Sequence, residues 1–283
     1  MPCALRVGVE SRHWLLLYTT PKKEEKMKNP IVLIHGMMSD AELAWKDLKQ
    51  SLQEKGYNVI ALTLPFHTKG LSDKDRSNYC SYGLAAYVAH IQNEIRMHCL
   101  PKKPIVIGHS MGGWIAQKLA TTKMVKKLIL INPMPPKRLC YWSAGAVATF
   151  SEILLKAHVM TGGIWKISPE KMRYGFFNGI PTGVQEEMID NSVHESGKAI
   201  FDSFNSLNPL GSLTLIDERH VRCPVLVQSG EEDKVIPTSI SKKIAKKYGA
   251  TFQQFKNGCH FMQRQPETVK NIGNEIHSWI RSN

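Results

Sequence analysis

Three side chains that lie far apart in the sequence could together perform nucleophilic catalysis. Ser110 stands in the Gly-x-Ser-x-Gly turn of residues 108–112. A serine hydroxyl becomes a competent nucleophile when an imidazole removes its proton, and a carboxylate on the other ring nitrogen fixes the tautomer of that imidazole. His260 and Asp233 are the candidates for these two roles, with Glu232 as a less favoured carboxylate. Ser110, Asp233 and His260 are therefore candidates for a catalytic triad.

Each of these candidates lies within five residues after the end of a stretch that we predict to be a β-strand. In an open α/β sheet, the carboxyl ends of parallel strands meet at one edge, where active sites are found. A serine in a sharp strand-to-helix turn presents its hydroxyl at that edge, and flanking glycines let neighbouring backbone approach it closely. The three strands are predicted at residues 105–107, 225–228 and 251–255.

The rest of the chain alternates short β-branched runs with longer amphipathic stretches. This order is typical of helices that cross over a mostly parallel sheet. Further strands are predicted at residues 31–34, 59–64 and 128–131, after an opening hairpin of residues 5–9 and 14–19. Helices are predicted at residues 44–54, 82–98, 112–121 and 239–247, and a last one opens at Pro266. We expect an α/β fold with helices on both faces of the sheet.

Residues 135–221, here called the insertion, interrupt this alternation. They contain no convincing buried strand, but they do contain helix-like stretches rich in aromatic residues and Met, the first of them at residues 142–155. We predict that the insertion is a helical cap on a core of residues 1–134 and 222–283. Such a cap would place apolar side chains over the nucleophile, although each could instead pack the cap onto the core. The candidate substrate contacts are Trp142, Phe150 and Trp165.

Taken in chain order, these motifs resemble those of the α/β-hydrolase superfamily, in its branch of lipases and carboxylesterases. The resemblance includes the serine turn, a His-Gly pair at His35, a Gly-x-x-Asp loop at residues 230–233, and a histidine after the last strand. It implies that the backbone N–H groups of Met37 and Met111 bind the oxyanion, where losing one donor typically costs about 10²–10³ in rate. His35 and His109 lie inside these motifs, where they orient loops or line the substrate pocket.

The resemblance implies a serine hydrolase that needs no cofactor. Its favoured substrate is a medium-sized apolar carboxylic ester, with a thioester or lactone as variants, cleaved through an acyl-enzyme on Ser110. A C–C bond hydrolase with the same triad, or a non-catalytic receptor of small molecules, stays open as an alternative. Epoxide hydrolases and haloalkane dehalogenases of the superfamily are disfavoured because they carry Asp at the position of Ser110, and epoxide hydrolases usually have a proline shortly after the glycine equivalent to Gly36.

Composition excludes several other classes of function. The 283 residues are 42% hydrophobic and carry a net charge of +13, which is spread over short clusters without interleaved aromatic residues. Solvated helix faces explain this charge better than attraction to acidic partners, and we expect no nucleic-acid partner.

No run approaches the roughly 18 apolar residues of a membrane span, so no stable membrane insertion is expected. No metal-ligand spacing occurs, and six scattered cysteines predict free thiols in the cytoplasm.

Overall fold

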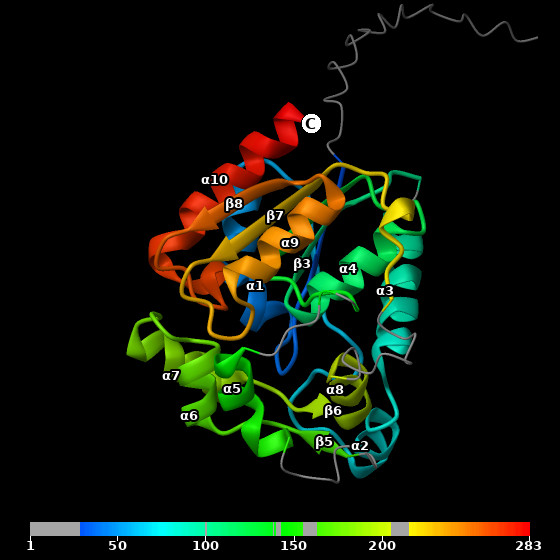
Figure 1. Cartoon of the computed structure of the whole chain (residues 1–283). Coiled ribbons are helices and arrows are strands. Elements are labelled where there is room, and N and C mark those ends of the chain that lie inside the picture. Colours follow the sequence, from blue (N-terminus) through cyan, green and yellow to red (C-terminus); the bar gives the residue numbers. More distant parts are fainter. Residues whose placement is uncertain (1–28, 100, 138, 140–142, 155–162, 205–214) are drawn as a thin grey trace, which may run out of the picture.

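A single parallel sheet organises the molecule. The computed structural model describes residues 29–99, 101–137, 139, 143–154, 163–204 and 215–283 (Figure 1). Within these residues, six strands form the sheet in the order β2-β1-β3-β4-β7-β8, and all neighbours are parallel. The strands are β1 (Ile31–Ile34), β2 (Val59–Leu62), β3 (Ile105–His109), β4 (Lys127–Ile131), β7 (Val225–Gly230) and β8 (Thr251–Phe255). The predicted α/β fold is confirmed, whereas the predicted hairpin of residues 5–9 and 14–19 lies outside the described residues.

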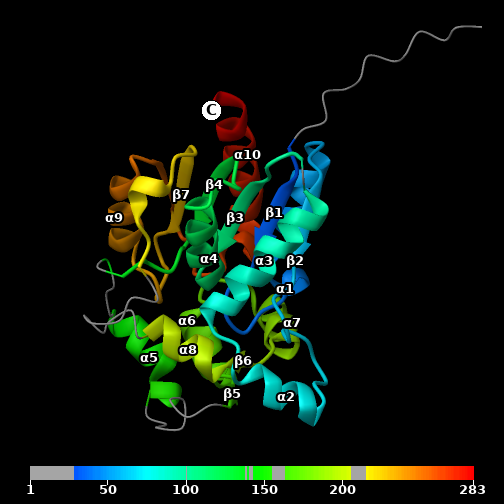
Figure 2. The same cartoon turned by 90° about the vertical axis from the view of Figure 1, so that its right-hand side faces the viewer.

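Helices cover both faces of this sheet, as predicted. On one face, α1 (Ala41–Glu54) packs against α10 (Pro266–Ser282). On the other face lie α3 (Leu84–His98), α4 (Met111–Ala120) and α9 (Thr238–Tyr248) (Figures 1 and 2). The predicted ends of these helices agree with the structure to within three residues.

The strands consist largely of apolar residues because helices cover both faces of the sheet. Both faces of a parallel sheet are buried, so its strands are continuous apolar runs instead of alternating patterns. All residues of β1, β3 and β4 are buried accordingly. Helix α1 begins where the Asp40 side chain accepts the Leu43 N–H at 2.7 Å, which satisfies one donor of its first turn.

Residues 143–154 and 163–204 of the insertion lie at the end of the sheet toward which the strands point, whereas its residues 218–220 lie near the start of the strands, where His220 shares a pocket with Asn29 and Lys103 (Figure 1). The described part of the insertion contains α5 (Ala144–Leu154), β5 (Ile164–Trp165), α6 (Pro169–Gly175), α7 (Thr182–Asn191), β6 (Glu195–Ser196), α8 (Gly197–Phe204) and a 3₁₀ turn (Glu218–His220). We predicted no strand here, but β5 and β6 pair antiparallel over two residues each. Strands this short carry no readable alternation of apolar and polar residues.

A further helix, α2 (Asp73–Tyr79), was not predicted and lies beside the insertion (Figure 2). Its sequence, DKDRSNY, has no apolar stripe that would indicate a helix. The Ser72 side chain starts it by accepting the Asp75 N–H at 3.1 Å. Tyr79, at its end, is fully buried, which gives this polar helix its anchor.

The central strand β3 should be the most sensitive part of the fold to truncation. Ile107 is 0% exposed, so Ile107→Ala leaves a cavity and should lower the free energy of unfolding by about 2–5 kcal/mol. Met97→Ala on α3 is the matched control, because Met97 is 68% exposed and its loss should change stability by less than about 0.5 kcal/mol. Urea denaturation followed by tryptophan fluorescence measures both, and equal effects would contradict the assignment of β3 to the core.

Candidate active site

The turn that carries Ser110 has strained backbone. Ser110 joins β3 to α4 with φ 52° and ψ −122°, outside the conformations that L residues prefer. Its carbonyl accepts the N–H groups of Gly113 and Met134, both at 2.9 Å, and these bonds hold the turn in place. A Cβ on Gly112 would lie 2.2 Å from the carbonyl oxygen of Ile34, so only glycine lets α4 start this close to β1. The Ser110 side chain consequently stands half-buried at the carboxyl edge of the sheet.

The loop after β1 runs directly against Ser110. A Cβ on Gly36 would lie 2.9 Å from the Cβ of Ser110, so this position also requires glycine. Among the described residues, the N–H groups of Met37 and Met111 have no hydrogen-bond acceptor. Met111 is also the first residue of α4, where the helix dipole favours negative charge. Two free donors beside a serine are what an oxyanion site requires.

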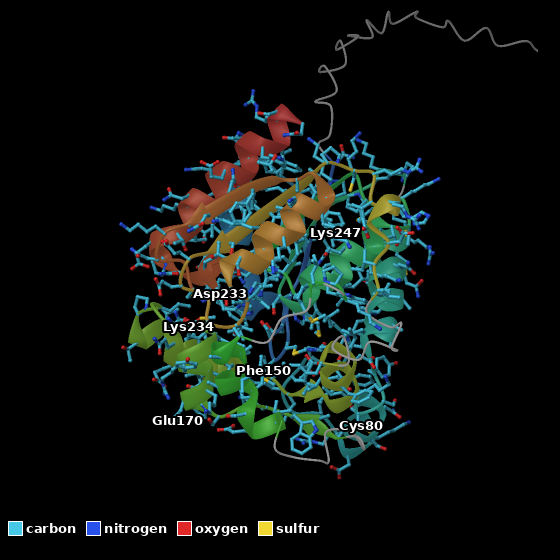
Figure 3. The ribbon with its side chains drawn as sticks, viewed as in Figure 1. Cys80, Phe150, Glu170, Asp233, Lys234 and Lys247 are labelled. Carbon is cyan, nitrogen blue, oxygen red and sulfur yellow. The ribbon has the colours of Figure 1, made fainter. Side chains whose placement is uncertain are left out.

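The three residues of the expected triad are brought together by the fold. The Nε2 atom of His260 lies 3.1 Å from the Oγ of Ser110, and its Nδ1 lies 2.8 Å from the Oδ2 of Asp233. The other oxygen of Asp233 accepts the N–H groups of Val235 and Ile236, each at 2.8 Å. A carboxylate beside Nδ1 fixes the proton there, which leaves the lone pair of Nε2 facing the serine hydroxyl. Asp233 is labelled in Figure 3, on the loop after β7.

Two neighbours that could compete for these roles lie elsewhere. Glu232 has an exposed side chain that pairs with Lys234 at 3.5 Å, so it does not replace Asp233 beside the imidazole. Cys259 is fully buried, and burial raises the pKa of its thiol. Because the thiolate is the nucleophilic form of cysteine, this residue is a packing group.

His35 and His109 are both fully buried and bind backbone groups. His35 donates from Nδ1 to the Gly36 carbonyl at 2.8 Å and accepts the Leu64 N–H on Nε2 at 3.0 Å. His109 donates from Nε2 to the carbonyl of His260 at 2.8 Å. Burial lowers the pKa of both imidazoles, so they remain neutral. Of the two roles that the sequence left open for them, this geometry favours loop orientation over substrate contact.

Asn132 is a site residue that the sequence analysis missed. It follows β4 with a positive φ of 41° and is fully buried. Its Nδ2 donates to the carbonyls of Cys259 and His260, at 3.0 and 2.9 Å, while its Oδ1 accepts the Gly230 N–H at 2.8 Å. One amide therefore joins the ends of three strands and fixes the His260 loop. An asparagine directly after a buried strand was the available signal, since Asn adopts positive φ more readily than most residues.

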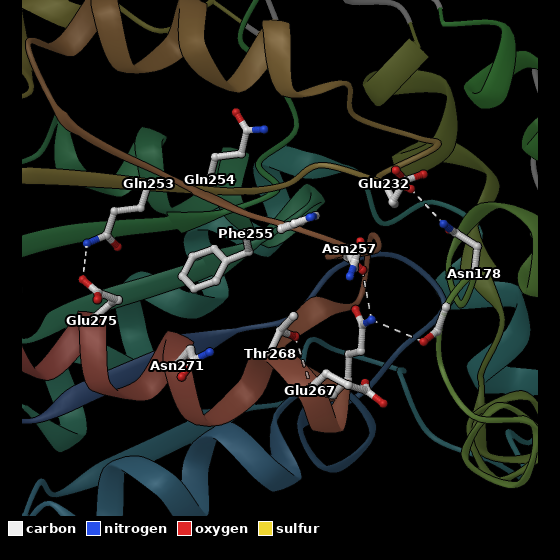
Figure 4. A pocket seen from close by; sticks show the side chains of 13 residues that line it. Asn178, Glu232, Gln253, Gln254, Phe255, Asn257, Glu267, Thr268, Asn271 and Glu275 are labelled. Atoms are coloured by element: carbon white, nitrogen blue, oxygen red, sulfur yellow. Dashed lines mark hydrogen bonds between the residues drawn. The ribbon is translucent and has the colours of Figure 1, made fainter.

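Amide side chains also tie the acid and histidine loops to the insertion. Gln265 donates from Nε2 to the carbonyls of Asn257 and Gly179, at 3.0 and 3.3 Å. Asn178 donates to the carbonyl of Glu232 at 2.8 Å. These residues line a groove of about 940 Å³ that lies beside the triad, between β8, α10 and the insertion (Figure 4). The groove is polar and contains none of the three triad side chains.

The insertion contributes an aromatic ring to the site. Phe176 stacks on the imidazole of His260, with ring centroids 5.5 Å apart and an interplanar angle of 29°. Phe150 is buried and packs edge-on against Phe176, and Trp165 is half-buried in β5. The third expected contact, Trp142, lies outside the described residues. Phe176 was not among the expected substrate contacts, because aromatic density alone does not reveal which ring faces the histidine.

Two further observations concern cofactors and membranes. The described residues contain no cluster of three or more His, Cys, Asp or Glu side chains able to hold a metal ion. None of the helices in this part of the chain combines the length and the apolar character of a membrane-spanning segment. The four described cysteines, Cys80, Cys99, Cys223 and Cys259, are free thiols.

Comparison with known proteins places this geometry in a family. Residues 31–271 match the model of the alpha/beta hydrolase family. A curated relative is the uncharacterized hydrolase YugF of Bacillus subtilis (strain 168), which is 27% identical over 236 residues, 78% of this chain and 80% of the relative.

Two examples of solved structures that share the fold are a lipase and a methylesterase. A monoacylglycerol lipase from Paleococcus ferrophilus is 22% identical with a TM-score of 0.66, and 89% of this chain and 93% of that one are covered. The methylesterase MES16 from Arabidopsis is 14% identical with a TM-score of 0.68, and 90% and 100% of the two chains are covered. The family match spans most of the sequence, and the parallel sheet with Ser110 at its edge agrees with it: the chain belongs to the alpha/beta hydrolase family.

Proposed function

We propose that the protein is a serine hydrolase that cleaves a carboxylic ester of a medium-sized apolar substrate. The observation that supports this most directly is the unbroken contact chain from the Ser110 hydroxyl through His260 to Asp233, at 3.1 and 2.8 Å. Each contact has the length expected of a nucleophile with its base and of a base with its orienting carboxylate. The reaction class is therefore acyl transfer to water.

In the proposed reaction, the Oγ of Ser110 attacks the ester carbonyl while Nε2 of His260 takes the hydroxyl proton. The carbonyl oxygen becomes negative and is stabilised by the free N–H groups of Met37 and Met111. Collapse of this intermediate expels the alcohol, which receives the proton from His260, and leaves an acyl-enzyme on Ser110. A water molecule, deprotonated by His260, then attacks the acyl-enzyme and releases the acid. Asp233 stays ionised and stabilises the imidazolium in both steps.

The insertion supports an apolar substrate. Phe176 presents a ring against the catalytic imidazole, and it is backed by Phe150 and Phe177. A hydrophobic cap over the acyl group excludes water, which strengthens the electrostatic interactions at the oxyanion site. The names methylesterase and monoacylglycerol lipase describe ester cleavage by two proteins of the same fold. A thioester or lactone offers the same electrophilic carbonyl and belongs to the same proposal.

Nothing in this chemistry requires a cofactor, since the nucleophile and the base are both side chains. The scattered cysteines and the absence of any CxxC pair in the sequence support a reducing compartment, and we propose the cytoplasm. The proposed partner is the small apolar ester itself.

Substitution of the nucleophile tests the proposal directly. Ser110→Ala should abolish labelling by a fluorophosphonate probe and lower kcat for p-nitrophenyl esters by about 10⁴-fold or more. Ser282→Ala, at the end of α10, is the matched serine control and should label like the wild type. Equal labelling of the Ser110→Ala variant would remove Ser110 from the mechanism.

The length of the acyl chain tests the apolar pocket. Across p-nitrophenyl esters from acetate to laurate, kcat/KM should rise to a maximum at intermediate length, by about tenfold for each two buried methylene groups. Profiling by stopped-flow absorbance measures this series. A flat series would contradict the apolar pocket, and turnover of a vinylogous 1,5-diketone with no ester turnover would favour the C–C hydrolase. Stoichiometric binding of esters without turnover would identify a receptor.

Asn132 should affect catalysis without touching the substrate. Asn132→Ala removes both donors to the His260 loop, and the resulting misplacement of the imidazole should lower kcat about 10- to 100-fold. Asn58→Ala is the matched control, because Asn58 is exposed at the opposite edge of the sheet. If Asn132→Ala retained wild-type kcat, Asn132 would have no role in positioning His260.

A further inference from the structure

A buried polar cluster joins the insertion to the core close to the proposed oxyanion site. Its members are Glu195 in β6, His67 in the loop after β2, Tyr79 in α2 and Tyr87 in α3, and we call this cluster the latch. All four residues are 0% exposed. Burying a carboxylate so completely is unfavourable unless it is paired and hydrogen-bonded, so such a cluster is maintained only where it is satisfied.

Glu195 has partners on both of its oxygens. Its Oε2 lies 3.0 Å from the Nε2 of His67. Its Oε1 accepts the hydroxyl of Tyr87 at 2.7 Å and the N–H of Ser196 at 3.0 Å. The hydroxyl of Tyr79 donates to the carbonyl of His194 at 3.0 Å. Burial, reinforced by the neighbouring Glu195, raises the pKa of both phenols, so Tyr79 and Tyr87 remain protonated donors.

Proton counting shows how His67 and Glu195 are coupled. The Nδ1 of His67 faces the carbonyl of Pro65 at 3.1 Å, and a carbonyl can only accept, so this nitrogen carries a proton. The Nε2 faces the carboxylate, so a second proton lies between the ring and Glu195. The pair is therefore neutral as a whole, and removal of either partner leaves an unsatisfied polar group in the interior.

The latch and the chain next to it contact the segment of residues 35–38, which carries the Met37 N–H. The His67 ring of the latch lies edge-on against the ring of His35, with centroids 4.9 Å apart. Val193, which lies outside the latch but two residues before Glu195, donates its N–H to the Met38 carbonyl at 3.1 Å. Met38 has a left-handed φ of 57°, which costs a non-glycine residue about 1–2 kcal/mol. A strained loop of this kind keeps its conformation only when surrounding contacts hold it.

We infer that the latch holds the Met37 N–H in the orientation that the oxyanion needs, and that Glu195 is its positioning residue. This inference rests on the proposed function. It assigns the insertion a part in the reaction itself, because the residue that holds the oxyanion loop belongs to β6. Without the carboxylate, His67 and the segment that bears Val193 are free to shift, and the Met38 turn can relax.

Two substitutions of Glu195 separate positioning from mere stability. Glu195→Gln keeps an acceptor for Tyr87 and gains a donor for a neutral His67, so kcat for a p-nitrophenyl ester should stay within about threefold of wild type. Glu195→Ala removes all of these bonds, and kcat should fall about 10- to 100-fold while KM stays within about twofold, since an oxyanion donor acts only in the transition state. Glu187→Ala is the control, because Glu187 forms an exposed bridge from the insertion to Lys46 of the core.

Hydrogen exchange supplies the readout that is independent of activity. The amides of Val193 and Leu64 donate to Met38 and to His35, so both report on the segment of residues 35–38. They should exchange faster in Glu195→Ala than in wild type, but not in Glu195→Gln or Glu187→Ala. Unchanged kcat in Glu195→Ala, a loss confined to KM, or a lower kcat with wild-type exchange would each overturn the inference.

A further variant and a further measurement complete the test. If Glu195→Ala does not fold, Tyr87→Phe removes one bond to Glu195 and keeps the ring, and it should show the same pattern at smaller size. Wild-type exchange and kcat in Tyr87→Phe would then overturn the inference. A wild-type protein that is not labelled at Ser110 counts against the proposed function, whereas the exchange of Val193 and Leu64 separately decides whether the latch holds the loop.

Discussion

The proposed chemistry depends on one contact, the approach of the His260 imidazole to the Ser110 hydroxyl. The two residues are 150 positions apart, and the contact exists because β3, β7 and β8 are parallel and end at one edge. A parallel arrangement also explains why Asp233 arrives on the other side of the ring. Side chains alone do not hold the geometry, since the main-chain carbonyl of His260 accepts hydrogen bonds from both His109 and Asn132.

Backbone strain is concentrated at the same edge. Met38, Ser110 and Asn132 each follow a strand of the sheet by a few residues or fewer, and each has a positive φ. Such conformations are unfavourable for residues other than glycine and persist only when packing and hydrogen bonds determine them. The bonds are Gly113 and Met134 to the Ser110 carbonyl, Val193 to the Met38 carbonyl, and the Asn132 side-chain amide to Gly230 and to the loop of Cys259 and His260. Packing and hydrogen bonds at the edge of the sheet thus keep Met38, Ser110 and Asn132 in these conformations.

Features of the fold and the site that depend on neighbouring residues could be predicted from the sequence, whereas features that depend on contacts between distant residues could not. The strands were predictable because burial on both faces produces continuous apolar runs, and Ser110 because its turn needs glycine where backbone meets backbone. The pairing of His67 with Glu195 could not be predicted, because the two residues are 128 positions apart and no spacing in the sequence connects them. Phe176 was missed because aromatic density does not show which ring faces the histidine, and Asn132 because its position directly after a buried strand was not used as a signal. Helix α2 was missed because burial of Tyr79 stabilises it, and its sequence has no helical periodicity of its own.

The residues of the insertion therefore fall into two groups, which differ in how readily they could be replaced by other residues. Most of its apolar side chains fill volume, and a pocket wall can be rebuilt from other apolar residues of similar size. Phe176 and Glu195 are different, since Phe176 stacks on the imidazole of His260 and Glu195 pairs with His67, whose ring contacts His35 in the loop after β1. A hydrolase can change its substrate by replacing the first group and keep its reaction only by retaining the second. In the proposed reaction, the residues that position the reacting groups would thus extend beyond the sheet to Glu195, a buried carboxylate of the insertion.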